Sequence, residues 1–169
     1  MIFLTAGAER MRIDANGDVT HYGGLTMASG KDIIFSDVAE EFDMADVQAE
    51  PGTVMAIDHD GTLRPCSSPY DQKVAGIVSG AGDYRPAVVL GKTAQMGNRR
   101  SLALVGKAYC KVEGDSSPIE VGDLLTTSSV PGHAMKAADR FKAFGAVIGK
   151  ALRPWRGGRG LIPILIALQ

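Results

Sequence analysis

The chain of 169 residues is long enough for one domain, or for one domain with a short appendage. Hydrophobic residues make up 45% of it and charged residues 22%, which are ordinary values for a protein with a core of its own. The formal net charge of −1 gives no electrostatic reason to expect nucleic acid or an anionic membrane as a partner. The 21 glycines and the aromatic content of 6% favour short strands and tight turns over long helices.

Neither end of the sequence predicts membrane insertion. The apolar run at Met1–Gly7 is too short for a signal peptide, and no apolar stretch of 18 residues follows it. Leu161–Leu168 is interrupted by Pro163 and predicts a buried strand. Cys66 and Cys110 lie far apart and form no C-x-x-C pair, so we expect two buried thiols instead of a zinc or redox site.

Residues 1–35 do not show the periodicity of a packed domain. Glu9–Val19 alternates polar and apolar residues and contains Asn16-Gly17, a strong signal for a β-hairpin. Gly23–Leu25 and Ser29–Ile33 repeat a glycine turn followed by a short apolar segment. Segments this short become stable when neighbouring chains supply the missing face, as in an interwound β-fibre. An isolated flexible N-terminal tail is the alternative interpretation.

Residues 36–169 show the pattern of a β domain. Turn residues recur every 8–12 positions, which is typical of a sandwich or a barrel. Asp58–Gly61 predicts a hairpin turn, and Gly106 predicts either a bulge in the longest strand or a close approach of another backbone. Only Ser36–Gln48 and Ala137–Ala143 are candidate helices. About nine strands are expected, at 53–57, 62–64, 74–78, 87–90, 101–112, 124–127, 134–136, 144–152 and 161–168.

Several motifs carry a resemblance to phage fibre proteins. Glu9–Val19 resembles the E-R-M-R-I-D-x-x-G-x-V segment near the C-terminal ends of phage tail-fibre and tail-spike proteins. Residues 36–169 are similar to the C-terminal auto-processing, intramolecular-chaperone domain of phage appendage proteins, the glutamic peptidase (peptidase G2-like) type. The residues that carry this second similarity are Ser36–Glu40, Val74–Gly80, Pro118–Ser128 and Gly145–Leu152.

The resemblance implies a mainly β homotrimer located in the tail fibre of a virion or a phage-like particle and made in the host cytoplasm. A short intertwined trimeric β-shaft at 1–35 would lead into a β-sandwich or barrel-like tip domain at 36–169 with little helix. The tip domain would nucleate the trimer, and its partners would be copies of itself, an upstream fibre shaft and a host surface receptor. The alternative function is a permanently retained receptor-binding tip without catalytic activity. A monomeric β-barrel enzyme would need a catalytic cluster that the sequence does not show.

The same resemblance implies self-cleavage, because members of this family cut their own chain at a Ser-Asp bond. Carried over, the scissile bond is Ser36–Asp37, and the candidate catalytic residues are Ser36, Asp37 and Glu40. Amide hydrolysis needs a base to activate water or the Ser36 hydroxyl and an acid to protonate the leaving nitrogen. A carboxylate three residues downstream is within reach in a turn or a first helical turn, and two close carboxylates push their pKa values apart. The alternative is an ordinary helix start, with Ser36 as cap and Glu41 beside Glu40 in the first turn.

No metal or cofactor site is predicted. Asp58-His59-Asp60 lies in a hairpin turn, where consecutive side chains rarely converge on one ion. The resemblance implies that ATP aids domain release in some members, but no phosphate-binding loop is present here. A Ser-Lys dyad would need a lysine opposite the nucleophile, which no spacing shows. Trp155, within Arg153–Arg159, suits either an interface hot spot or a loop whose Trp covers the core.

Overall fold

The computed structural model describes residues 1–22, 37–45, 49–84, 86–91 and 97–168. The chain divides into two compact units, Met1–Ile33 and Ile34–Gln169. This division falls close to the predicted one after residue 35, but the join lies outside the described residues. Each unit is therefore considered by itself.

The first unit is an antiparallel three-stranded sheet in the order β1-β2-β3. It consists of β1 (Ile2–Thr5), β2 (Ala8–Ile13) and β3 (Val19–His21). The hairpin predicted from Asn16-Gly17 is confirmed, because β2 and β3 pair through Ile13 and Val19 on either side of it. Gly17 has a φ of +86°, which a residue with a side chain rarely adopts. Every described residue of this unit is exposed or half-buried, so residues 1–22 of a single copy form no core.

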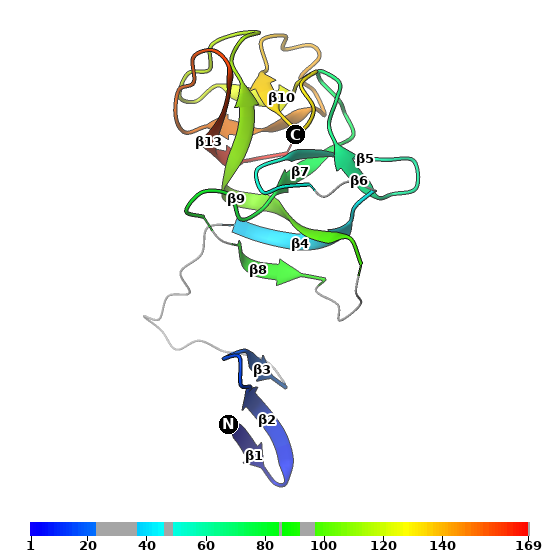
Figure 1. Cartoon of the computed structure of the whole chain (residues 1–169), viewed down its shortest axis with the longest axis vertical. Helices are drawn as coiled ribbons and strands as arrows, with labels where there is room; N and C mark the ends of the chain where they lie inside the picture. Colours follow the sequence, from blue (N-terminus) through cyan, green and yellow to red (C-terminus); the bar gives the residue numbers. More distant parts are fainter. Residues whose placement is uncertain (23–36, 46–48, 85, 92–96, 169) are drawn as a thin grey trace. The chain divides into compact units, whose positions relative to one another are not determined.

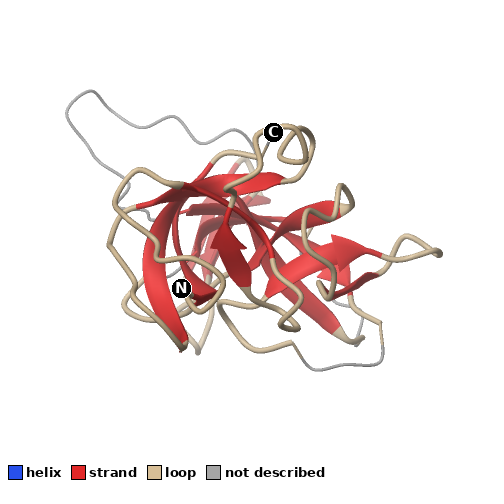
Figure 2. Cartoon of the chain, turned by 90° about the horizontal axis from the view of Figure 1, so that it is seen from above, coloured by secondary structure: helices blue, strands red, loops and turns tan. Residues whose placement is uncertain are grey.

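The second unit contains a closed five-stranded barrel with further strands attached, which confirms the prediction of a mainly β, barrel-like fold. The barrel runs β9-β13-β12-β10-β11 and closes where β11 pairs with β9 in parallel, at Ala134 and Val112. All nine strands expected after residue 52 are present, and Figure 2 shows strands and loops in the described part of the chain, with no helix. Their bounds are β5 (Val54–Ile57), β6 (Leu63–Pro65), β7 (Val74–Val78), β8 (Pro86–Leu90), β9 (Arg99–Glu113), β10 (Leu124–Thr127), β11 (Ala134–Lys136), β12 (Val147–Ala151) and β13 (Arg159–Ile166).

The long strand β9 connects the barrel to the strands outside it (Figure 1). Its C-terminal half pairs with β13, and its N-terminal half pairs with β7 and with β4 (Asp37–Asp43). Gly106, at the change between the two halves, has a φ of +108°. The irregularity predicted at Gly106 lies two residues earlier, where Leu104 is the extra residue opposite β4. The strand therefore bends at this point, and it pairs with β4 before the bend and with β13 after it.

Both helix predictions are wrong in the described residues. Asp37–Asp43, within the predicted helix Ser36–Gln48, is strand β4, which pairs in parallel with β8 and antiparallel with β9. A strand with a neighbour on each side satisfies its backbone hydrogen bonds completely, and this outweighs the cap-like Ser-Asp-x-x-Glu pattern. Ala137–Ala143 forms turns, because the Asp139 carboxylate accepts hydrogen bonds from two following amides and no further helical turn develops.

Two groups of buried side chains make the core of the second unit. The larger group fills the barrel and includes both cysteines, and the smaller group lies between β5, β6 and the N-terminal half of β9. Burial raises the pKa of the Cys66 thiol to about 11 and also raises the pKa of the Cys110 thiol. Both cysteines are free, which confirms the prediction of two buried thiols.

Candidate functional site

The candidate chemistry is located at the start of β4, where Asp37 is 4% exposed. Its Oδ2 accepts a hydrogen bond of 2.6 Å from the Ser79 hydroxyl. Its Oδ1 is buried and has no hydrogen-bond partner among the residues that the structure describes. Burial raises the pKa of the Asp37 carboxyl, and the hydrogen bond from Ser79 opposes this only in part. Asp37 is therefore a buried acid with one unsatisfied oxygen, an unusual arrangement for a purely structural residue.

Ser79 is held in place by its own backbone. It directly follows β7, and its amide donates a hydrogen bond of 2.8 Å to the carbonyl of Ser101 in β9. Because β9 also pairs with β4, the same strand positions both members of the Asp37–Ser79 pair. In the sequence, Ser79 is part of the Val74–Gly80 motif, and nothing in that motif predicts a role for it. The contact joins residues 42 positions apart, and no local sequence signal could have found it.

Glu40 does not meet Asp37 within one chain. In a strand, residues three positions apart point to opposite faces, and here Asp37 and Ala39 are buried while Val38 and Glu40 are half-buried. Glu40 lies beside Gly91, which follows β8, with its Cγ 3.6 Å from where a Cβ of that glycine would be. The geometry expected from a first helical turn is therefore wrong. Ser36 lies outside the described residues, so the proposed scissile bond and the catalytic roles stay predictions.

Two acidic residues that follow Glu40, namely Glu41 and Asp43, connect β4 to β9. Arg99, in β9, donates a hydrogen bond of 2.7 Å to the Glu41 carbonyl. Its guanidinium also lies 3.8 Å from the Glu41 carboxylate and 3.3 Å from that of Asp43. These ion pairs join residues of two adjacent strands. Arg99 therefore holds β4 against β9.

The two remaining sequence candidates have structural roles. In the Asp58-His59-Asp60 turn, the Asp60 carboxylate accepts hydrogen bonds from the amide and the hydroxyl of Thr62. Among the described residues, no group of three or more His, Cys, Asp or Glu side chains could hold a metal ion. Trp155 packs against the barrel core and donates its Nε1 hydrogen to the Gly158 carbonyl. Of the two alternatives expected for Trp155, this arrangement matches the loop whose tryptophan covers the core.

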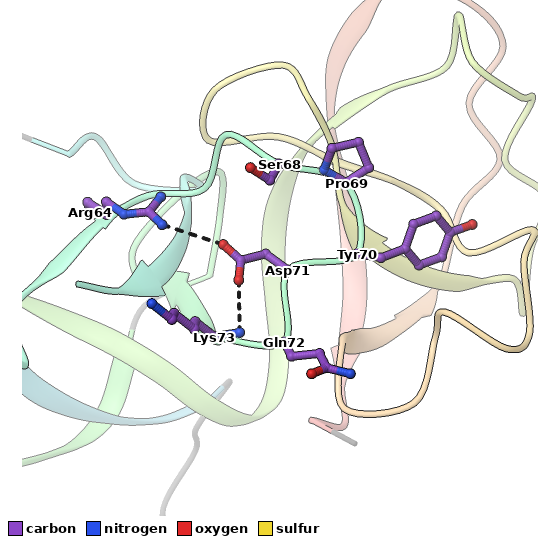
Figure 3. A pocket seen from close by; sticks show the side chains of 7 residues that line it. All are labelled: Arg64, Ser68, Pro69, Tyr70, Asp71, Gln72 and Lys73. Carbon is purple, nitrogen blue, oxygen red and sulfur yellow. Dashed lines mark hydrogen bonds and ion pairs between the residues drawn. The ribbon is translucent and has the colours of Figure 1, made fainter. Parts of the chain in front are cut away.

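An open, polar pocket of about 490 Å³ lies on the second unit (Figure 3). Arg64 approaches the Asp71 carboxylate to 3.6 Å, and Asp71 also accepts a hydrogen bond from the Lys73 amide. Figure 3 shows Arg64 and Lys73 on one side of Asp71 and the Tyr70 ring on the other. Tyr70 has a φ of +55°, a conformation that a bulky residue rarely adopts and that often marks functional loops. The lining residues are Arg64, Ser68, Pro69, Tyr70, Asp71, Gln72 and Lys73.

Comparison with known proteins does not assign the chain to a family. No protein-family model matches it, and no curated protein matches it. The resemblance to phage fibre proteins therefore depends on the quoted motifs alone. In the described part of the chain, no helix has the length and apolar character needed to cross a membrane.

Proposed function

We propose that this chain is the C-terminal part of a homotrimeric tail fibre of a phage or a phage-like particle. In this proposal the first unit is a segment of the fibre shaft, and the second unit is the domain that nucleates and registers the trimer. The motif at Glu9–Val19 and the motifs of residues 36–169 support the assignment to fibre proteins. Self-cleavage at Ser36–Asp37 is the finer part of the proposal.

The uncovered apolar face of the first unit carries the proposal. Strand register puts Phe3 beside Met11 and Ile13 beside Val19, all on one face of the sheet. Phe3 is 46% exposed and Val19 is 59% exposed. A three-stranded sheet needs a covered hydrophobic face for independent stability. Other copies of the same chain would supply that cover, and closed symmetry leaves no copy with an open face.

The oligomeric state tests this proposal. Light scattering after size-exclusion chromatography, repeated over a range of concentrations, should give three times the chain mass for the wild type. Phe3→Lys adds a charge to the apolar face and should dissociate the trimer. Thr20→Lys adds the same charge to the opposite face, where Thr20 pairs with Arg12 and is exposed, and should leave the trimer intact. A wild type that is monomeric at every concentration would overturn the proposal.

The cleavage part has a separate test, the intact mass of freshly purified and aged protein under denaturing conditions. Self-processing predicts one fragment that ends at Ser36 and one that begins at Asp37. Glu40→Gln should abolish both fragments if Glu40 takes part, whereas Glu41→Gln serves as the neighbouring control. A single full-length species in the wild type would reject cleavage and leave the trimer proposal standing.

The pocket around Tyr70 favours the second candidate, a retained receptor-binding tip. An open polar pocket with an aromatic ring, an arginine and a lysine offers stacking and hydrogen bonds to a polar surface ligand such as a saccharide. Binding of the wild type to a glycan array, lost in Tyr70→Ala, would favour this function. Equal binding by the wild type and the variant would reject this pocket as the receptor site.

A further inference from the structure

A pocket of about 440 Å³ on the second unit carries three basic side chains. It lies where the barrel closes, beside the strands β9, β11 and β13. Its volume is within the range of pockets that hold small molecules. Its lining residues are Pro51, Lys111, His133, Arg159, Gly160 and Leu161.

Strand pairing brings two of the basic side chains together on the outer face of the barrel. Val112 of β9 pairs in parallel with Ala134 of β11, and both residues are completely buried in the core. Successive residues of a strand point to opposite faces. Lys111 and His133, each one position earlier, therefore lie side by side on the outside.

Arg159 reaches the same face from β13, the other neighbour of β9. Lys111 pairs with Leu161, and Arg159 lies two residues before Leu161, so both residues of β13 are on one face. Side chains from three adjacent elements therefore surround one space, although no single segment of the sequence contains all of them.

Lys111 and His133 are held in position. The Lys111 amide donates a hydrogen bond of 2.8 Å to the Gly52 carbonyl, and its Nζ lies 2.9 Å from the Glu50 carboxylate. The Nδ1 atom of His133 lies 2.7 Å from the Pro131 carbonyl oxygen. Because a carbonyl oxygen only accepts, Nδ1 carries the hydrogen, and Nε2 is the nitrogen that remains for a ligand.

The carboxylates near the pocket leave its cations available. Glu50, the partner of Lys111, has a side chain that is 79% exposed, and such exposed ion pairs contribute little. Glu113 lies opposite Arg159 in the strand register, but its two oxygens already accept four hydrogen bonds from amides and hydroxyls. In the part of the chain that the structure describes, Arg159 forms no ion pair. Its guanidinium N–H groups can therefore donate to a ligand.

We infer that this pocket binds a small organic anion, with its carboxylate or phosphate group between Lys111, His133 and Arg159. A guanidinium matches both groups with two parallel hydrogen bonds, and an ammonium adds a point charge. Pro51 and Leu161, which is 40% exposed, offer an apolar wall to the rest of the ligand. The whole chain has a net charge of −1, so recognition of an anion depends on this local group. The inference goes beyond the proposed trimer and does not depend on it.

Calorimetric titration of the full-length protein tests the ligand class, and it should be run at low ionic strength because salt screens such contacts. The probes are phenyl phosphate and benzoate, which carry the two anionic groups on the same ring, and benzyl alcohol as a neutral analogue. At least one of the anions should bind with a Kd of about 1 mM or tighter, and the tighter one identifies the group that the pocket prefers. Equally tight binding of benzyl alcohol, or no binding of either anion, would overturn the inference.

Three substitutions assign the binding to this pocket. Arg159→Gln should weaken binding of the better probe by at least about tenfold, because charge-assisted hydrogen bonds are lost. Arg153→Gln removes the same charge from an exposed arginine outside the pocket and should leave the affinity unchanged. Glu50→Gln should tighten binding roughly two- to fivefold, because Lys111 loses its competing partner. Equal affinities of the wild type and Arg159→Gln, or no tightening in Glu50→Gln, would overturn the assignment.

Amide chemical shifts of the isotope-labelled wild type locate the ligand without any substitution. The amide signals of Lys111, Gly160 and Leu161 should shift to saturation with the better probe, whereas the signal of Gln72, in the pocket around Tyr70, should not. Shifts at Gln72 with none at Gly160 would place the anion in the other pocket and overturn the inference. A monomer that binds the anion here would reject the trimer proposal alone, and a trimer that does not bind it would reject this inference alone.

Discussion

Replacing Glu113 tests whether a buried, hydrogen-bonded carboxylate stabilises the second unit. Glu113, the last residue of β9, is 3% exposed, and both of its carboxylate oxygens are satisfied. Oε2 accepts hydrogen bonds from the amides of Asp115 and Ser116, at 3.0 and 3.1 Å. Oε1 accepts from the hydroxyls of Ser116 and Ser128, at 2.6 and 3.2 Å. One carboxylate therefore fixes the loop after β9 to the segment after β10.

Two substitutions should have different effects. Glu113→Ala removes both acceptor oxygens and with them all four hydrogen bonds. The fully buried Ser128 hydroxyl cannot turn to water, so we expect a loss of roughly 2–4 kcal/mol in stability. In Glu113→Gln the amide oxygen can face the two backbone amides while its NH2 group faces hydroxyls that can rotate to accept. Only the charge assistance is lost, so the loss should be about 1 kcal/mol.

The penalty in Glu113→Gln should depend on pH. Burial by itself raises the pKa of the Glu113 carboxyl, but the hydrogen bonds from Ser116, Ser128 and Asp115 outweigh it and lower the pKa below its usual range. A carboxyl whose pKa is lower in the folded state stabilises that state above the unfolded pKa of about 4.3. This contribution disappears as the pH falls through the folded pKa. The difference between the wild type and Glu113→Gln should therefore shrink on acidification.

Urea denaturation followed by the fluorescence of Trp155, the single tryptophan, measures these differences. The titrations should be run at pH 7 and pH 3 at one fixed protein concentration, since association shifts the apparent stability. Glu120→Gln, which removes an exposed acid paired with Arg156, is the control and should change stability by less than about 1 kcal/mol. A Glu113→Gln protein as stable as the wild type at pH 7, or one with an equal deficit at pH 3, would refute the reasoning.

Three further predictions concern other buried positions. Ser79→Ala removes the hydrogen bond that Ser79 donates to the Asp37 carboxylate, so it should raise the pKa of that carboxyl further and lower stability at pH 7 by roughly 1–3 kcal/mol; an unchanged urea midpoint would contradict this. Cys66 should react with a thiol reagent only after unfolding, because it is buried and its pKa is about 11; rapid labelling of the native protein would count against the structure. Gly149→Ala should prevent correct pairing of β12 and β13, since the new Cβ would overlap the Leu165 carbonyl oxygen; circular dichroism of a normally folded variant would disprove it.

Local signals were sufficient to predict most of the strands. Alternating residues bounded by glycine turns located β5 to β13, and Asn16-Gly17 and Asp58–Gly61 located two hairpin turns, because the conformations involved are set by a few adjacent residues. The prediction failed at β4. Its residues resemble a capped helix, and only pairing with β8 and β9, more than 40 positions away, makes them a strand. Barrel closure pairs Ala134 of β11 with Val112 of β9, which are also too far apart in the sequence for a local pattern to reveal.

The candidate site could be predicted only in part for the same reason. The sequence pointed to Asp37, whose burial and unsatisfied oxygen make it distinctive in the structure. It could not identify Ser79 as the partner, because the contact exists only after β4 and β7 have joined β9. Lys111, His133 and Arg159 carry no motif, and their position around one pocket becomes visible only in three dimensions.

The strand conformation of β4 separates the assembly proposal from the cleavage proposal. Asp37 and Glu40 face opposite sides of the strand, so a reaction that uses both carboxylates requires either a rearrangement of β4 or a carboxylate from another copy. The assembly proposal needs neither, because it rests on the exposed apolar face of the first unit. A protein that forms trimers without cutting itself would therefore be fully consistent with the described structure. A protein that cuts itself as a monomer would require β4 to leave its place between β8 and β9.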